Sequence, residues 1–169
     1  MSSGVAPGKV TGAGPVPADL DERMRARDTD PLPDGALVKF QAISRSPDPR
    51  TNVRWVLDDD GAVRLAYHSR RTDSAVPFDT KLPRKPTGTV DASTVDEIRT
   101  LLDEEGFAEL APYQWRAGEG GAWFVVTARA GGAVREVIYD RASTPLVDRL
   151  QRVPGELLDE DEDEDEDEE

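Results

Sequence analysis

The chain has 169 residues, of which 37% are apolar and 33% are charged, a composition that suits one folded domain with polar segments attached. It contains no cysteine, which excludes a disulfide framework, a thiolate zinc site and a cysteine nucleophile. No apolar run approaches the roughly 18–20 residues of a membrane-spanning helix, and the N-terminus lacks the apolar stretch of a secretory signal. We therefore expect a cytoplasmic protein with no membrane contact.

The net charge of −14 is concentrated at the C-terminus. Residues 154–169 carry 12 acidic groups and no basic one, whereas residues 36–153 carry 17 groups of each sign. Because a run of like charges repels itself, we expect 154–169 to be a disordered acidic tail. The segment 36–153 is then predicted to be a single, electrically balanced domain.

Residues 1–35 contain seven Pro or Gly among the first 17 and continue with a charged stretch. Met24 is the only sizeable apolar side chain between Leu20 and Leu32. Such a segment buries too little apolar surface to offset the entropy lost on ordering. We therefore predict a disordered or linker segment over 1–35.

Alternating apolar residues predict a first strand over 37–44. Two further alternating runs, 52–57 and 62–68, fit an antiparallel hairpin. Their apolar residues share one face if Trp55 lies opposite Leu65 and Leu57 lies opposite Val63. This register leaves a three-residue loop, 59–61, whose glycine takes the left-handed conformation.

A polar connection follows over 69–89. It contains Pro77 and Phe78 and five cations, which are Arg70, Arg71, Lys81, Arg84 and Lys85. Such a loop could bind the acidic surface of a partner, a phosphate backbone or this chain's own tail. An ordinary surface loop in an arginine-rich chain is the alternative.

The second half of the domain is predicted to hold two helices and a hairpin. The first helix opens near 91–94 with Ser93 and Thr94 at capping-box spacing, and Gly106 ends it. Strands over 122–130 and 133–140 then flank Gly131-Gly132, with Phe124 opposite Tyr139 and Val126 opposite Val137. Finally, Ser143 or Thr144 caps a helix that has Pro145 in its first turn. The sum is an α+β domain, in which an antiparallel sheet of about four or five strands has two helices packed on one face.

Few residues have the types or spacing that catalysis needs. His68 is the only histidine, so a Ser-His-Asp triad or an imidazole base would have to use it. Its place at a strand end favours a solvent-facing side chain. One histidine without cysteine does not make a zinc site, and the consecutive Asp58, Asp59 and Asp60 fit a tight turn better than a calcium loop. We expect neither a metal nor a cofactor.

Aromatic residues flank a Gly-rich stretch at 116–121. Tyr113 and Trp115 precede it, and Trp123 follows it. Aromatic side chains beside such loops occur at protein interfaces, but they also close the ends of small cores. Trp115 therefore joins the five cations of the 69–89 connection as a candidate binding residue.

The order of these elements resembles that of the emfourin-like protein inhibitors of thermolysin-type metalloproteases and of related small bacterial domains. The resemblance covers about residues 37–153. It depends on the Asp60-Gly61 turn, the run Glu105-Gly106-Phe107-Ala108-Glu109-Leu110, the Gly131-Gly132 turn and the closing Thr144-Pro145-Leu146. Residues 44–49 depart from the Gly-rich stretch expected after the first strand, so the resemblance assigns no inhibitory residue.

Together these observations predict a non-catalytic module that binds a protein partner, with protease inhibition as one form of that binding. We expect it to make no direct contact with nucleic acid. Two alternatives belong to other classes. One is an electrostatic regulator that uses the acidic tail against a basic partner, and the other is a small hydrolase or transferase that uses His68.

Overall fold

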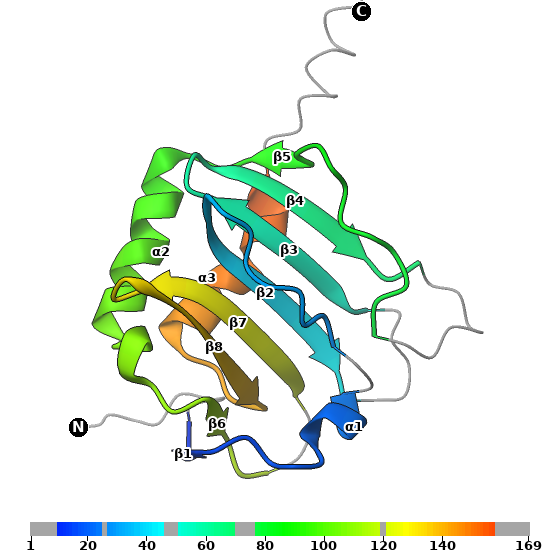
Figure 1. Cartoon of the computed structure of the whole chain (residues 1–169), viewed down its shortest axis with the longest axis vertical. Coiled ribbons are helices and arrows are strands. Elements are labelled where there is room, and N and C mark those ends of the chain that lie inside the picture. Colours follow the sequence, from blue (N-terminus) through cyan, green and yellow to red (C-terminus); the bar gives the residue numbers. More distant parts are fainter. Residues whose placement is uncertain (1–9, 25–26, 46–50, 70–76, 119–120, 158–169) are drawn as a thin grey trace, which may run out of the picture.

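The computed structural model describes residues 10–24, 27–45, 51–69, 77–118 and 121–157, within which eight strands form one mixed sheet (Figure 1). Across the sheet the order is β1-β6-β8-β7-β2-β3-β4-β5. Only β6 and β8 pair in parallel, and the other neighbours are antiparallel. The strands are β1 (Gly12–Gly14), β2 (Ala36–Ser44), β3 (Val53–Asp58), β4 (Ala62–Tyr67), β5 (Gly88–Thr89), β6 (Tyr113–Trp115), β7 (Ala122–Ala130) and β8 (Ala133–Asp140).

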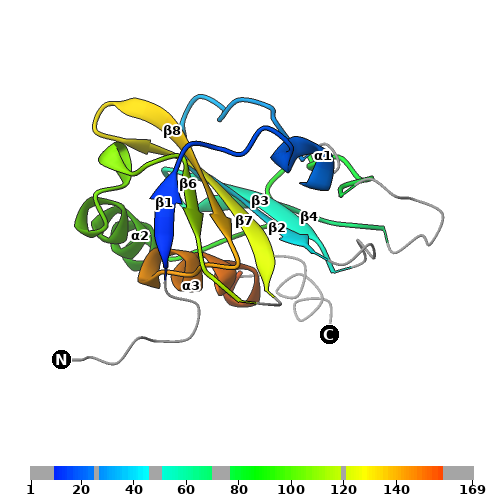
Figure 2. The ribbon, with the colours of Figure 1, turned by 90° about the horizontal axis from the view of Figure 1, so that it is seen from below.

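Different layers cover the two faces of the sheet (Figure 2). The helices α2 (Ala92–Glu104) and α3 (Pro145–Gln151) lie on one face, and the segment that contains α1 (Leu20–Met24) lies on the other. The larger core is under α2 and α3, where Phe40, Trp55 and Tyr139 of the sheet are at most 1% exposed. The 3-10 helices η1 (Phe107–Glu109) and η2 (Val153–Glu156) follow α2 and α3 and add Phe107 and Val153 to this core.

Both predicted hairpins are confirmed in register. Trp55 pairs with Leu65 and Leu57 with Val63 in the first hairpin, and Gly61 has a φ of 95°. In the second, Phe124 pairs with Tyr139 and Val126 with Val137. Turn chemistry and apolar alternation both act over short stretches of chain, which is why they predict these pairings correctly.

The predicted fold class, an antiparallel sheet of four or five strands with two helices on one face and a disordered N-terminal segment, is wrong. The sheet has eight strands and includes a parallel pair, and a third helix, α1, lies on its second face. The three strands that were missed, β1, β5 and β6, have two or three residues each. Strands this short have no measurable period, so only their long-range partners define them.

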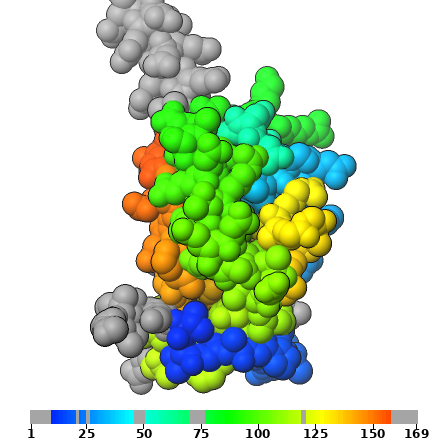
Figure 3. Space-filling view, turned by 90° about the vertical axis from the view of Figure 1, so that its left-hand side faces the viewer, coloured from blue at the N-terminus to red at the C-terminus, as the bar shows by residue number. Residues whose placement is uncertain are grey.

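The described part of the N-terminal segment packs on the sheet. Leu20 and Met24 are one helical turn apart and are 0% and 1% exposed, in one cluster with Trp123 and Ile138. At the molecule's edge β1 pairs with β6, so the N-terminal segment lies beside residues more than 100 positions later (Figure 3). The prediction failed because it counted only the segment's own few apolar groups, whereas the sheet supplies the rest of this cluster.

The helix ends agree with the sequence only in part. Asp91 precedes α2 without a side-chain cap, so the capping boxes expected at Ser93 and Thr94 do not form. Gly106 takes the expected left-handed conformation, with a φ of 63°. At α3 the Thr144 side chain accepts a hydrogen bond from the Val147 N–H, as predicted. Among the described residues, no helix has the length and apolar character needed to cross a bilayer. The acidic run beyond residue 157 lies outside the described part of the chain.

Candidate functional site

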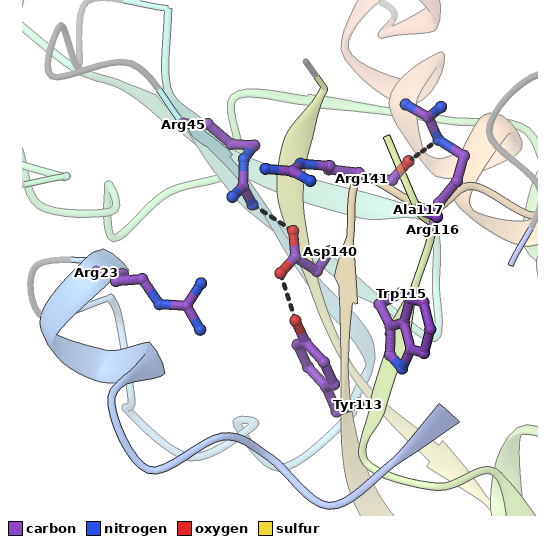
Figure 4. A pocket seen from close by; sticks show the side chains of 8 residues that line it. All are labelled: Arg23, Arg45, Tyr113, Trp115, Arg116, Ala117, Asp140 and Arg141. Carbon is purple, nitrogen blue, oxygen red and sulfur yellow. Dashed lines mark hydrogen bonds and ion pairs between the residues drawn. The ribbon is translucent and has the colours of Figure 1, made fainter. Parts of the chain in front are cut away.

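A pocket of about 410 Å³ opens at the end of the sheet where the strands β2, β6 and β8 reach their last residues (Figure 4). We call it the arginine pocket, and it is lined by Arg23, Arg45, Tyr113, Trp115, Arg116, Ala117, Asp140 and Arg141. Four of these eight side chains are guanidinium groups and one is a carboxylate. The pocket is therefore strongly cationic in a chain whose net charge is −14.

The sheet register explains why these distant residues meet. Trp115 pairs with Asp140 through the parallel β6–β8 ladder, and Asp140 pairs with Trp123 across β7. Because β2 runs antiparallel to β7, the last residue of β2 lies beside the first residue of β7. Arg45, which follows β2, therefore lies at the same end of the sheet. The helix α1 then adds Arg23 from the layer above.

Asp140 is the anchor of the pocket. It is 6% exposed, and its two carboxylate oxygens accept hydrogen bonds from Arg45 Nη1 and the Tyr113 hydroxyl. Burial, followed by the bond to Asp140, raises the pKa of Tyr113 to about 12, so the hydroxyl remains a donor at neutral pH. The guanidinium carbon of Arg45 also lies 4.5 Å from the ring centroid of Trp123, which fixes the position of Arg45.

The arginines of the pocket repel one another. Burial lowers the pKa of the Arg45 guanidinium, Asp140 opposes that shift, and the charges of Arg141 and Arg23 add to it. In Figure 4 the side chains of Arg23, Arg45 and Arg141 point toward the space beside Asp140. An anion in this space would relieve the repulsion.

Arg141 has two unusual features. Its φ of 61° is the only positive value for a non-glycine residue in the described part of the chain, and a long side chain is disfavoured in that conformation. Its Nε is buried and has no hydrogen-bond partner among the described residues. Its backbone carbonyl accepts a 2.7 Å bond from Arg116 Nε, and its Nη1 donates to the carbonyl of Gly118. Backbone strain and an unsatisfied buried donor in one residue are typical of functional sites.

A second pocket, of about 370 Å³, lies under the N-terminal segment on the second face of the sheet. Lys39 is 2% exposed there, and its Nζ lies 3.0 Å from Asp28 Oδ1 and 2.6 Å from the carbonyl of Asp30. Arg54 binds the other oxygen of Asp28 and the carbonyl of Thr80. Internal partners already use these charges, so this pocket is less suited to a ligand than the arginine pocket.

His68 does not face solvent as predicted, because it is 2% exposed. Its Nε2 lies 3.5 Å from Asp79 Oδ2, and the same carboxylate accepts hydrogen bonds from the backbone N–H and hydroxyl of Ser69. In a hydrolase triad the imidazole stands between the hydroxyl and the carboxylate. Here the carboxylate holds the middle place, and neither pocket described above includes His68.

The structure separates the binding residues that the sequence suggested. Trp115 is 38% exposed and lines the arginine pocket, whereas Lys81 lines the second pocket. Arg84 and Lys85 are exposed and precede β5, at the sheet edge opposite β1 and β6. Arg70 and Arg71 lie outside the described residues.

Sequence reasoning missed Arg23, Arg45 and Arg141 of the arginine pocket. They are single arginines spread over more than 100 positions of an arginine-rich chain, and no spacing rule connects them. The sequence offers one signal for two of them, because Arg45 and Arg141 each directly follow the end of a predicted strand.

The described part of the chain contains no group of three or more His, Asp or Glu side chains placed to hold a metal ion. No protein-family model, curated protein or solved structure matches the chain. The resemblance to emfourin-like inhibitors therefore stays a prediction.

Proposed function

We propose that this chain is a non-catalytic protein-interaction module that binds an anionic group of a partner protein in the arginine pocket. The observation that carries the proposal is the convergence of Arg23, Arg45 and Arg141 on the space beside one buried carboxylate. Guanidinium groups remain charged at any physiological pH and bind anionic oxygens through several N–H donors at once.

The surroundings of the pocket support binding rather than catalysis. Asp140 is held by Arg45 and Tyr113, so it orients the pocket and has no free oxygen poised as a base. Trp115 adds a partly exposed aromatic wall, and aromatic and arginine side chains are the residue types most enriched at the energetic centres of protein interfaces.

Affinity capture with immobilised full-length protein tests this function. We expect proteins from an extract of the source organism to be retained by the wild type and lost with Arg141→Gly. Glycine accepts the left-handed backbone of residue 141, so this substitution removes the side chain without straining the fold. Arg84→Gly is the matched control, because it removes an exposed arginine at the opposite edge of the sheet.

Retention of the same proteins by the wild type and by Arg141→Gly would contradict the proposal. Capture that instead depends on residues 159–169 would favour the electrostatic regulator. If the protein retained through the arginine pocket is a metalloprotease, an assay of its activity with and without this chain tests whether the interaction is inhibitory.

A further inference from the structure

The three converging arginines approach the pocket from different directions. Arg23 comes from α1, Arg45 follows β2, and Arg141 follows β8. A carboxylate has two oxygens whose lone pairs lie in one plane, so it accepts hydrogen bonds best from donors in that plane. A phosphoryl group has three acceptor oxygens arranged around phosphorus, so it can bind donors from three sides at once.

The charge of the three converging arginines and Asp140 also fits a phosphoryl group. Three arginines and Asp140 leave two net positive charges around the space that Arg23, Arg45 and Arg141 face. A phosphate monoester carries about −1.5 to −2 at pH 7, whereas a single carboxylate carries one negative charge. A phosphate monoester would therefore neutralise the group, and a carboxylate would leave it cationic.

Hydrogen-bond donors remain available for such a ligand. The guanidinium of Arg141 uses its Nη1 for the Gly118 carbonyl, which leaves the N–H groups of its Nη2 for a ligand in the pocket. Asp140 accepts a bond from Nη1 of Arg45, one of five N–H groups on that guanidinium. The Arg23 side chain is 40% exposed, and its ion pair with Asp19 at 3.2 Å is on the surface, where such pairs are readily exchanged.

We propose that the arginine pocket binds a phosphorylated side chain of a partner protein, an inference that rests on the proposed function. The phosphoryl group would lie among Arg23, Arg45 and Arg141, and the carrier side chain would pass along Trp115. Gly12 allows this arrangement, because a side chain there would collide with the Trp115 ring and push it from its place at the pocket.

Fluorescence anisotropy with the full-length protein tests the inference. The probes are three labelled nine-residue peptides that differ only at the central position, which holds phosphotyrosine, glutamate or tyrosine. Phosphotyrosine is chosen because its ring can lie against Trp115. We expect the phosphopeptide to bind at least about tenfold more tightly than the glutamate peptide, since hydrogen bonds to charged groups are individually worth tenfold or more.

Two variants assign the binding to the pocket. Arg141→Gly and Arg23→Ala should each weaken phosphopeptide binding by at least about tenfold, while Arg84→Gly should leave it unchanged. Arg23 is exposed on α1, so its loss leaves the fold intact even if Arg141→Gly alters stability. As a second line of evidence, treatment of the cell extract with phosphatase should abolish capture of the partner by the wild type.

Three results would overturn the inference. Equal binding of the phosphopeptide and the glutamate peptide would leave the proposed function standing and remove the phosphoryl preference. Competition by inorganic phosphate at the concentration of the peptide would identify a free anion as the ligand. Capture that survives phosphatase and yet is lost with Arg141→Gly would assign the pocket to an unmodified acidic partner, whereas the absence of any capture would contradict the proposed function itself.

Discussion

Asp28 lies outside the helices and strands, and its carboxylate forms ion pairs with both Lys39 and Arg54. Asp28→Asn should lower the free energy of unfolding by about 3 kcal/mol, since it leaves the buried Lys39 without a counter-charge. Urea denaturation at pH 7 measures this loss. Asp30→Asn is the control, because only the backbone of Asp30 bonds to Lys39.

The same carboxylate predicts a pH dependence. Burial raises the pKa of Asp28, but the Asp30 N–H, Lys39 and Arg54 outweigh it and hold the pKa below the ordinary 3.8. A folded-state pKa below the unfolded value means that the stabilisation is present above about pH 4 and is lost as the pH falls through the folded-state pKa. Wild type should therefore lose more stability than Asp28→Asn between pH 5 and pH 2. Parallel curves for the two proteins would contradict this assignment.

The burial of Lys39 and Gln41 could not be predicted from the sequence. Lys39 and Gln41 alternate with Val38, Phe40 and Ala42 on one strand, so polarity alone places them on a solvated face. They are buried because Gln41 binds the backbone of Asp28 and Lys39 binds its side chain. No local pattern reveals that a polar segment ahead of the strand folds back to supply those partners.

Between elements, Glu105 joins the end of α2 to the start of α3. Its Oε2 accepts a 2.7 Å hydrogen bond from the Leu146 N–H. Burial raises the pKa of Glu105 above its usual 4.5, in spite of this bond. For a carboxyl group, a raised folded-state pKa makes the protein less stable as the pH rises from the ordinary value through the folded-state one.

Glu105→Gln keeps an acceptor for Leu146 and removes the ionisable group. We expect a free energy of unfolding at pH 7 equal to or above that of the wild type, and a gain that is smaller at pH 4. Glu104→Gln is the control at an exposed neighbouring position. If Glu105→Gln is less stable than the wild type at pH 7 by about 1 kcal/mol or more, the carboxylate charge itself stabilises the start of α3.

Elements were predictable from the sequence when their signals were local. The two hairpins and the Thr144 cap depend on neighbours within a few residues, and all three are present. In contrast, β6 is a strand only because β1 and β8 lie on either side of it. The arginine pocket could not be predicted from the sequence for the same reason, because the long-range pairing of β6 with β8 brings Trp115 beside Asp140.

For the whole molecule, the N-terminal segment is a layer of the fold rather than an appendage. A chain that starts at Ala36 would expose Ile43, Trp123, Val125 and Ile138, which are at most 4% exposed when Leu20 and Met24 cover them. It would also leave Lys39 without Asp28. We expect this shortened chain to melt at least about 10 °C below the full chain or to aggregate, since each buried aliphatic side chain contributes roughly 1.5–3 kcal/mol.

Differential scanning fluorimetry and size-exclusion chromatography measure this effect. A chain that starts at Val10 is the control, because it retains β1, α1 and Asp28. Equal melting temperatures for the chains that start at Val10 and Ala36 would show that the first layer adds nothing to stability.

The position of β1 beside β6 has a consequence for biosynthesis. Gly12 leaves the ribosome about 100 residues before its partner Trp115. At roughly 5–20 residues per second, this delay amounts to about 5–20 s. During that time Leu20 and Met24 lack most of the surface they cover, since Ile43 is made early but Trp123, Val125 and Ile138 are made later still. The layer that contains β1 and α1 is therefore made well before it can dock, and it is a stretch on which a ribosome-associated chaperone would have a long time to act.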